Sequence, residues 1–331
     1  MPRLLWYAPG GGLGHVTRAV AILRLLRRRL PDLEARLVVT TPYLHGPLLE
    51  GIPTVRLPTP FEWRHTPDGD DGRVLSGLLE TLVGTDGPDL LVVDTHADGL
   101  CGELSQALLE RIPHRALIYR LGGVEPALSE NWPRYQLRLS PYPEPVHPET
   151  EAVGHVLVRG PDEVYTPAAA RRRLAIAEGE GPVVLGFHAG DPGEVSSFFA
   201  LLEAAVDRLP GTVLRLVTPA PLTEDHRPHR LHYQPVMEIL PAADLTLSGA
   251  GYNSVGEVRA LGLRALFCPF GRSHDRQDAR VSADERFALT IEPAELAARI
   301  LERLSQPRPQ PASQVDGAAR AAAALATLSG R

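Results

Sequence analysis

Apolar residues along this chain fall into two kinds of stretch, short continuous runs and longer segments with helical spacing. The first run, residues 4–8, predicts a strand that ends at Pro9 and a cluster of glycines. Apolar positions then recur every three or four residues from Val16 until Pro31, which predicts a helix. These segments therefore follow the order strand, glycine turn, helix.

The same alternation continues through the first half of the chain. Further strands are predicted at residues 36–40, 54–57, 90–94 and 115–120. Because these runs are continuous and helical stretches separate them, they indicate a parallel sheet covered on both faces. Residues 58–77 are rich in Pro, Asp and Gly, and we expect them to form a mobile surface loop.

A proline-rich segment, residues 140–148, divides the chain and predicts a linker. A second alternation follows, with strands predicted at residues 183–187, 213–217, 245–247 and 265–268 and helices at 195–209 and 253–261. After a second proline-rich segment, an alanine-rich helix is predicted at residues 315–328, and we expect it to pack back across the domain junction. We therefore predict two doubly wound α/β domains, residues 1–150 and 151–306, followed by a linker and helix at 307–331.

Composition narrows the function by exclusion. All 34 basic residues are arginine, which excludes a Schiff-base lysine and a P-loop lysine. Cys101 and Cys268 alone make neither a cysteine-rich zinc site nor a disulfide framework. The net charge of -6 is shared by both halves, so we expect no nucleic-acid partner. No signal-peptide pattern and no long apolar run is present, and we expect a cytoplasmic protein.

The first glycine loop, residues 10–15, lies where a predicted strand meets a predicted helix. Free backbone N–H groups and the helix dipole at such a turn can bind an anion. The loop does not match the dinucleotide fingerprint, because His15 replaces the third glycine and Thr40 and Thr41 stand where an acidic residue would end the second strand. Binding of NAD is therefore not expected.

His15 is the first candidate for catalysis. At a helix N-terminus the dipole disfavours its charged form and keeps a neutral imidazole available as a base. Asp94, at the end of a predicted core strand, could orient His15, and His96 could itself be the base. The alternatives are a helix-capping role for His15, a metal held by Asp94, His96 and Asp98, and a solvated loop with no role.

The most informative stretch is residues 242–257, where a third glycine loop (residues 249–254) opens into a helix. Exposed N–H groups there suit a diphosphate, and Glu257, one turn further along, can accept hydrogen bonds from the vicinal diol of a ribose. Asp275 and Gln277 follow the next strand, at the edge where open α/β sheets bind ligands, and suit sugar hydroxyls.

This run, Ala-Asp-Leu…Ser-Gly-Ala-Gly…Glu followed by Pro-Phe…His-Asp-Arg-Gln, resembles the donor-binding signature of glycosyltransferase family 28, the group that contains the peptidoglycan N-acetylglucosaminyltransferase. The Gly-Leu-Gly-His of the first loop is similar to that family and to nucleotide-sugar hydrolases on the same GT-B scaffold. The motifs cover about the first 30 residues and residues 230–280.

The resemblance implies a GT-B fold, two doubly wound Rossmann-like domains that face a central cleft, with the acceptor on the N-terminal domain. Arg159 near the hinge would approach the nucleotide, and the backbone at Tyr233 would read the base. His188 lies in a second glycine loop that departs from the family's Gly-Gly-Ser. The candidate nucleotide-sugar-binding residues are Gly12, Gly14, Arg159, His188, Tyr233, Gly249, Ala250, Gly251, Asn253, Ser254, Glu257, Asp275 and Gln277.

The function that this implies is an inverting, metal-independent hexosyltransferase that moves a sugar from a UDP-sugar to a hydroxyl acceptor, with His15 as candidate base. It needs no cofactor beyond the donor substrate, and its partners are the nucleotide sugar and an acceptor whose identity, lipid-linked or saccharide, stays open, as does peripheral membrane contact. Two alternatives also stay open, a nucleotide-sugar hydrolase and a non-catalytic sensor or partner-binding protein.

Overall fold

The computed structural model describes residues 2–41, 44, 46–58, 71–120, 126–218, 227–272, 275–313 and 316–330. The chain divides into two compact units, each with its own sheet. The first unit comprises Met1–Val158 and Asp316–Arg331, and the second comprises Arg159–Val315. Each unit is described by itself below.

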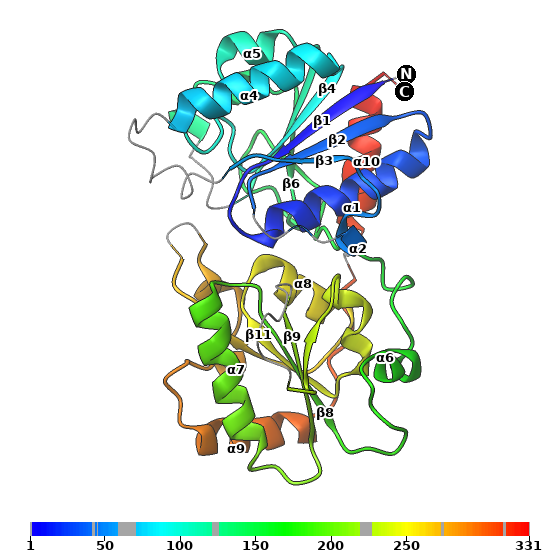
Figure 1. The fold of residues 1–331 in the computed structure, drawn as a ribbon, viewed down its shortest axis with the longest axis vertical. Coiled ribbons are helices and arrows are strands. Elements are labelled where there is room, and N and C mark those ends of the chain that lie inside the picture. Colours follow the sequence, from blue (N-terminus) through cyan, green and yellow to red (C-terminus); the bar gives the residue numbers. More distant parts are fainter. Residues whose placement is uncertain are drawn as a thin grey trace. The chain divides into compact units, whose positions relative to one another are not determined.

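The first unit is a parallel sheet with helices on both faces (Figure 1). Its described strands are β1 (Arg3–Ala8), β2 (Glu34–Val39), β3 (Thr54–Arg56), β4 (Leu90–Asp94), β5 (His114–Ile118), β6 (Leu137–Ser140) and β7 (Glu151–Ala152), in the order β3-β2-β1-β4-β5-β6-β7. Its described helices are α1 (Leu13–Arg29), α2 (Gly46–Leu49), α4 (Asp71–Asp86), α5 (Gln106–Glu110) and α10 (Gly317–Leu328), with 3-10 turns at Pro126–Leu128 and Trp132–Arg134.

Continuous apolar strands in this unit are buried on both faces, as the sequence predicts. Leu5 and Tyr7 of β1 pack into a core with the apolar face of α4 and with α5, while α1 and α10 cover the opposite face. The many alanines of α10 allow it to pack closely along α1, and Ala321 and Ala322 are fully buried.

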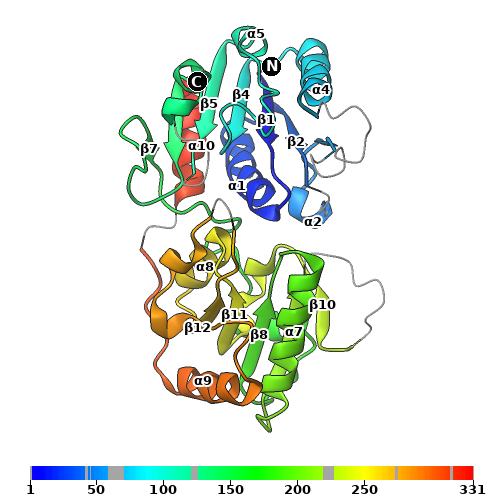
Figure 2. The ribbon, with the colours of Figure 1, turned by 90° about the vertical axis from the view of Figure 1, so that its left-hand side faces the viewer.

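The second unit is a smaller parallel sheet in the order β10-β9-β8-β11-β12 (Figure 2). Its described strands are β8 (Val183–Phe187), β9 (Val213–Thr218), β10 (Arg230–His232), β11 (Leu245–Gly249) and β12 (Ala265–Cys268). Its described helices are α6 (Pro167–Arg173), α7 (Pro192–Val206), α8 (Tyr252–Ala260) and α9 (Pro293–Ser305), with 3-10 turns at Val236–Glu238, Leu240–Ala242, Gln277–Arg280 and Ala283–Glu285. One core packs α7 and α9 on one face of the sheet, and a second packs α6 and α8 on the other.

The two doubly wound α/β units confirm the predicted fold class, but the predicted linker at residues 140–148 is wrong. This segment lies inside the first unit, between β6 and β7, which pair in parallel. Aromatic packing holds it there: the His147 ring lies 5.1 Å from the Trp132 ring, and the Trp132 indole N–H donates to Glu149 at 2.6 Å. The prolines therefore shape a connection within the sheet, and the units divide after Val158 rather than at residue 150.

The predicted C-terminal boundary at residues 306 and 307 also differs from the structure. Residues 306–312 remain in the second unit, where Arg264 donates to the Gln306 carbonyl at 2.5 Å and the Ala312 N–H donates to the Arg259 carbonyl at 2.9 Å. The chain then returns to the first unit, where α10 contacts α1.

The loop predicted at residues 58–77 is wrong in its last part, because residues 71–77 belong to α4, and residues 59–70 lie outside the described residues. Within the described ranges, none of the helices has both the length and the hydropathy that crossing a membrane requires.

Candidate functional site

The first glycine loop connects β1 to α1 and is held by the two threonines that end β2. The Gly10 N–H donates to the Thr40 hydroxyl at 2.7 Å. The same hydroxyl donates to the Gly10 carbonyl at 3.2 Å. The Thr41 hydroxyl donates to the Gly11 carbonyl at 3.1 Å. Thr40 and Thr41, which stand where a dinucleotide-binding protein has an acidic residue, therefore fix the backbone of this loop.

Helix α1 begins at Gly12 with neither a side-chain cap nor an acidic residue in its first turn. The backbone N–H groups of such a turn are suited to an anion. Gly12 is exposed and Gly14 is partly exposed, so this N-terminus can be reached from solvent.

His15, in the first turn of α1, is anchored to the end of β4. Its Nδ1 lies 2.5 Å from Oδ2 of Asp94. The His15 side chain keeps 15% of its exposure, whereas that of Asp94 is fully buried. The ring lies flat against Gly10, where an added Cβ would come within 2.5 Å of the His15 Cδ2 atom. The structure thus joins His15 and Asp94 as the sequence suggested.

Arg18 completes this group with a bidentate contact to the same carboxylate. Its Nε donates to Oδ1 of Asp94 at 2.7 Å and its Nη2 donates to Oδ2 at 2.5 Å. Burial opposes ionisation of Asp94, but the Arg18 guanidinium and His15 outweigh it and hold the pKa of this carboxyl well below its usual range.

Burial lowers the pKa of His15, and the attraction of Asp94 offsets this effect only in part. His15 is therefore neutral near pH 7. Because an ionised Asp94 accepts only, the Nδ1–H of His15 donates to it and Nε2 carries the free lone pair. An imidazole in this tautomer can take a proton at Nε2.

His96 and Asp98 follow β4, and the His96 N–H donates to the Asp94 carbonyl at 2.9 Å. The rings of His96 and His15 are stacked with their centroids 6.0 Å apart. Asp98 accepts a hydrogen bond from the Asn131 N–H at 3.2 Å. Over the described ranges, histidines, cysteines and carboxylates form no group of three that could hold a metal ion.

In the second unit, the third glycine loop leads from β11 into α8. This helix begins at Gly251 without a side-chain cap and without an acidic residue in its first turn, whereas Thr166 caps α6 and Asp191 caps α7. The first N–H groups of α8, on Tyr252 to Ser254, are therefore suited to an anion. Ala250 is buried, and an added Cβ on Gly251 would meet no atom closer than 4.0 Å.

Arg280 ties this loop to the segment after β12. Its guanidinium donates to the Ala250 carbonyl at 2.6 Å and to Oδ1 of Asp275 at 2.5 Å. Asp275 is therefore half of an ion pair that supports the loop. Sequence reasoning missed Arg280, although its spacing of five residues from Asp275 within a charged segment was visible.

Glu257 lies on α8 and is 4% exposed. Its carboxyl group makes no hydrogen bond to the described residues, and burial raises its pKa to about 8. A buried carboxyl without a protein partner is costly unless it meets a ligand. Gln277 is also buried, and its Oε1 accepts from the Phe270 N–H at 3.1 Å, which leaves its NH₂ group to donate.

His188, from the second glycine loop, lies against the start of the third. Its ring stacks on Phe270 with centroids 4.2 Å apart, and an added Cβ on Gly249 would come within 2.8 Å of the His188 Nδ1 atom. Burial lowers the pKa of His188 to about 4, so the ring is neutral near pH 7. The structure gives His188 a packing contact with the donor-side loop.

Arg159 and Tyr233 meet at a carboxylate that the sequence analysis did not single out. Nε of Arg159 donates to Oε1 of Glu238 at 2.7 Å, and the Tyr233 hydroxyl donates to Oε2 at 2.9 Å. Burial, the Tyr165 hydroxyl and Glu238 together raise the pKa of Tyr233 well above its usual range. Residues far apart in the sequence thus form one cluster in the second unit.

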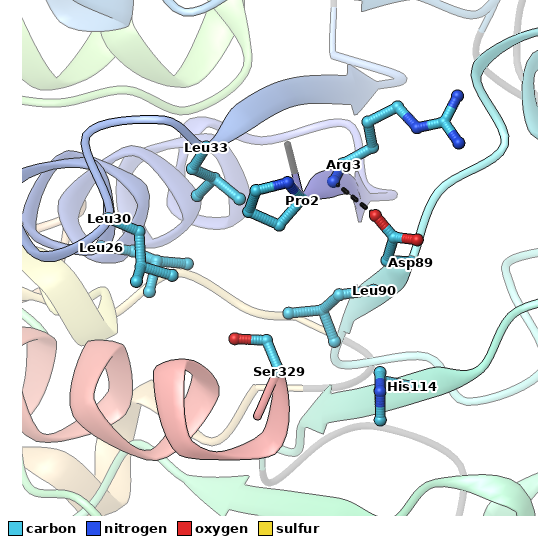
Figure 3. A pocket seen from close by; sticks show the side chains of 9 residues that line it. All are labelled: Pro2, Arg3, Leu26, Leu30, Leu33, Asp89, Leu90, His114 and Ser329. Atoms are coloured by element: carbon cyan, nitrogen blue, oxygen red, sulfur yellow. Dashed lines mark hydrogen bonds between the residues drawn. The ribbon is translucent and has the colours of Figure 1, made fainter. Parts of the chain in front are cut away.

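In the part of the first unit that the structure describes, a cavity of about 280 Å³ lies away from these residues, at the amino ends of the strands (Figure 3). It is lined by Leu26 of α1, by Leu30, which follows this helix, and by Arg3, whose backbone N–H donates to Asp89 at 2.8 Å. The candidate residues His15 and Asp94 lie at the opposite edge, where β1 and β4 end. This cavity therefore takes no part in the candidate site.

No protein-family model and no curated protein matches the chain. Solved structures match it over nearly its whole length. The spinosyn rhamnosyltransferase SpnG complexed with thymidine diphosphate is 16% identical with a TM-score of 0.55, covering 100% of this chain and 96% of that one. The calicheamicin glycosyltransferase CalG4 is 18% identical with a TM-score of 0.62, covering 100% and 99%.

A Listeria monocytogenes protein assigned as a UDP-N-acetylglucosamine 2-epimerase also matches, at 12% identity and a TM-score of 0.60, covering 98% of this chain and 96% of that one. At these identities the likeness shows the fold. This chain has the GT-B fold, and membership of family 28 stays a prediction.

We predict that Gly10→Ala displaces His15, because Gly10 has φ of +145° and an added Cβ would overlap the imidazole. The strain should destabilise the protein by about 1–3 kcal/mol, measured by chemical denaturation. Gly12→Ala is the control, since its Cβ would meet no atom within 4 Å. If the two variants were equally stable, the loop would accommodate the added Cβ without strain, and the prediction would be wrong.

We predict that Glu257 makes stability fall as pH rises. With its pKa raised from about 4.5 to about 8, the neutral carboxyl contributes stability below pH 4.5 that is lost as pH rises through 8. The stability of Glu257→Gln should equal that of wild type near pH 4.5 and exceed it near pH 8. Unfolding free energies across this window test it, with exposed Glu302→Gln as control; parallel curves for wild type and Glu257→Gln would contradict it.

Proposed function

We propose that this protein is an inverting, metal-independent glycosyltransferase that moves a hexosyl group from a UDP-sugar to a hydroxyl acceptor. The observation that carries the proposal is the imidazole of His15 at the end of a glycine loop, which burial keeps neutral and whose tautomer the ionised Asp94 fixes. The GT-B fold and the resemblance to family 28 support it. A cytoplasmic location is part of the proposal.

The chemistry asks little of the protein. Nε2 of His15 takes the proton of the acceptor hydroxyl as the oxygen attacks the anomeric carbon of the donor. The bond from that carbon to the β-phosphate oxygen breaks, the nucleoside diphosphate leaves, and the configuration inverts. His15 becomes imidazolium in this step, and the Asp94 carboxylate next to Nδ1 stabilises the new charge.

The second unit is proposed to hold the donor. The diphosphate binds at the N-terminus of α8, which has no side-chain cap, and there the helix dipole replaces a metal ion in stabilising the departing charge. The unsatisfied carboxyl of Glu257 accepts from the ribose hydroxyls, and the NH₂ group of Gln277 donates to the sugar. The cluster of Arg159, Tyr233 and Glu238 is proposed to lie near the nucleobase.

The proposed partners are thus a nucleotide sugar and a hydroxyl acceptor. SpnG was solved with thymidine diphosphate and, separately, with spinosyn aglycone. A thymidine nucleotide is therefore the alternative to UDP that the binding experiment includes. Lipid-linked and saccharide acceptors are both compatible with a hydroxyl nucleophile.

We predict that UDP binds equally well with and without a chelator, because the described residues include no group of three histidines, cysteines or carboxylates that could hold a metal ion, and α8 has no side-chain cap. At a pH above 8, where the Glu257 carboxyl is ionised, Glu257→Ala should weaken UDP binding by about 1.5–3 kcal/mol, the range for hydrogen bonds to charged groups. Calorimetry measures both, with Glu302→Ala as control. Binding abolished by the chelator would contradict metal independence.

A thymidine diphosphate arm sharpens this experiment. Thymidine diphosphate lacks the ribose 2′-hydroxyl, so it should bind wild type more weakly than UDP does. Its affinity should also fall less than that of UDP in Glu257→Ala. If the variant binds UDP as tightly as wild type while folded, Glu257 does not contact the ribose.

We predict that His15→Ala lowers turnover by roughly 100-fold to 10,000-fold, the usual contribution of a general base, while UDP affinity changes by less than about threefold. Release of UDP from UDP-sugars, with and without acceptor mixtures, measures turnover. His96→Ala is the matched control, a neighbouring imidazole at the same edge. A loss confined to His96→Ala would move the base there, and donor turnover independent of acceptor would identify a hydrolase.

A further inference from the structure

Arg18 is the charged side chain buried most completely beside the candidate base. It follows His15 by three positions on α1, so both side chains lie on the same face of the helix. Its exposed fraction is zero, and so is that of Asp94. The guanidinium therefore contacts the carboxylate out of reach of solvent.

This contact is bidentate, which fixes the orientation of the carboxylate as well as its charge. Arg18 reaches both oxygens of Asp94, through Nε at 2.7 Å and Nη2 at 2.5 Å. A planar guanidinium matches a carboxylate in this geometry, and it stays charged at any pH the protein meets. A buried ion pair of this kind is costly to form, and fixing one geometry is its best-attested use.

The backbone next to Asp94 supplies a second, independent observation. Thr95 has φ of +71°, a left-handed conformation that is strongly unfavourable for a β-branched residue. In this conformation its hydroxyl accepts from Nη2 of Arg18 and donates to Oδ2 of Asp94, both at 3.3 Å. Its N–H is held by the Ile118 carbonyl at 2.8 Å. Strain of this kind is typical of functional positions.

We propose that Arg18 is a positioning residue, which aims the Asp94 carboxylate at Nδ1 of His15 and opposes a positive charge on the ring, so that Nε2 stays available as the base. This proposal rests on the function proposed above, because His15 acts as a base only in that reaction. The placement of Arg18 against Asp94 stands without it.

The charges around His15 give the proposal its measurable consequence. The groups that face the ring are Asp94 from β4, Arg18 from α1, Arg120 after β5 and the stacked His96. After burial, which lowers the pKa of His15 most, Asp94 raises it, and Arg18 and Arg120 lower it. Removing the Arg18 charge therefore raises the pKa of His15 and leaves more imidazolium at a given pH.

The test is an NMR titration of the His15 ring in wild type, Arg18→Met and Arg18→Lys, assigned by the resonance lost in His15→Gln. The pKa of His15 should rise in Arg18→Met and lie between the other two in Arg18→Lys, which keeps the charge but loses the fork. Arg24→Met is the matched control, since Arg24 lies on the same helix with 10% side-chain exposure and donates instead to the Val158 carbonyl.

Turnover gives a second readout, through UDP release from UDP-glucose and UDP-N-acetylglucosamine. In Arg18→Met, kcat/KM should fall about tenfold near pH 6 and by less than about threefold near pH 8.5, because a higher pH restores the neutral imidazole. An equal loss at both pH values, with the His15 titration unchanged, would make Arg18 merely structural and overturn the proposal.

If Arg18→Met does not fold, Arg18→Lys decides: a His15 titration identical to wild type in this variant overturns the proposal, and a rise supports it. Failure of the proposed function looks different. In that case the titration shifts as expected, while neither wild type nor any variant releases UDP.

Discussion

The carboxylate of Asp94, shared by a histidine and an arginine, is the interaction on which the candidate site of the first unit is built. β4 lies next to β1 in the sheet, so the end of β4 meets the start of the helix that follows β1. Asp94 is the last residue of β4, and His15 and Arg18 come from the first two turns of α1. The parallel strand order thus brings a carboxylate together with an imidazole and a guanidinium that are more than 70 residues away in the sequence.

The glycine loop is shaped to leave room for this group. Gly10 adopts a conformation open to glycine, and the His15 ring occupies the space that a Cβ would fill. Thr40 and Thr41 hold the loop from the neighbouring strand. A dinucleotide-binding protein uses the same strand end for a ribose. Here Thr40 and Thr41 at that strand end bind the backbone of the glycine loop instead.

Much of the fold could be predicted because its central strands are continuous apolar runs. β8 and β12 have the bounds that the sequence predicted. The short strands β6, β7 and β10 escaped prediction, because Arg138 interrupts the apolar residues of β6, because β7 and β10 have one apolar residue each, and because neighbouring strands supply the pairing. The prolines of residues 140–148 suggested a linker because periodicity alone does not show the packing of Trp132 that holds them.

The site was predictable where a single residue type carries the chemistry and unpredictable where partners come from distant segments. His15, Asp94 and Glu257 stood out by position. Arg18 did not, because an arginine within a helical stretch is usually solvated, and only the fold shows that it points inward at Asp94. Glu238 was missed for the same reason, since its partners Arg159 and Tyr233 meet it only in the folded unit.

The described helix N-termini differ in whether carboxylates already lie at them. At α7, Asp191 caps the helix and Glu194 lies in its first turn, paired with Arg272 at 2.6 Å, so carboxylates already occupy the place of an anion. α1 and α8 begin at glycines and carry no acidic residue there. Because His188 packs against Gly249, the second loop supports the third. Under the proposed function the diphosphate binds at α8 and not at α7, so donor binding does not require a Gly-Gly-Ser sequence in the second loop.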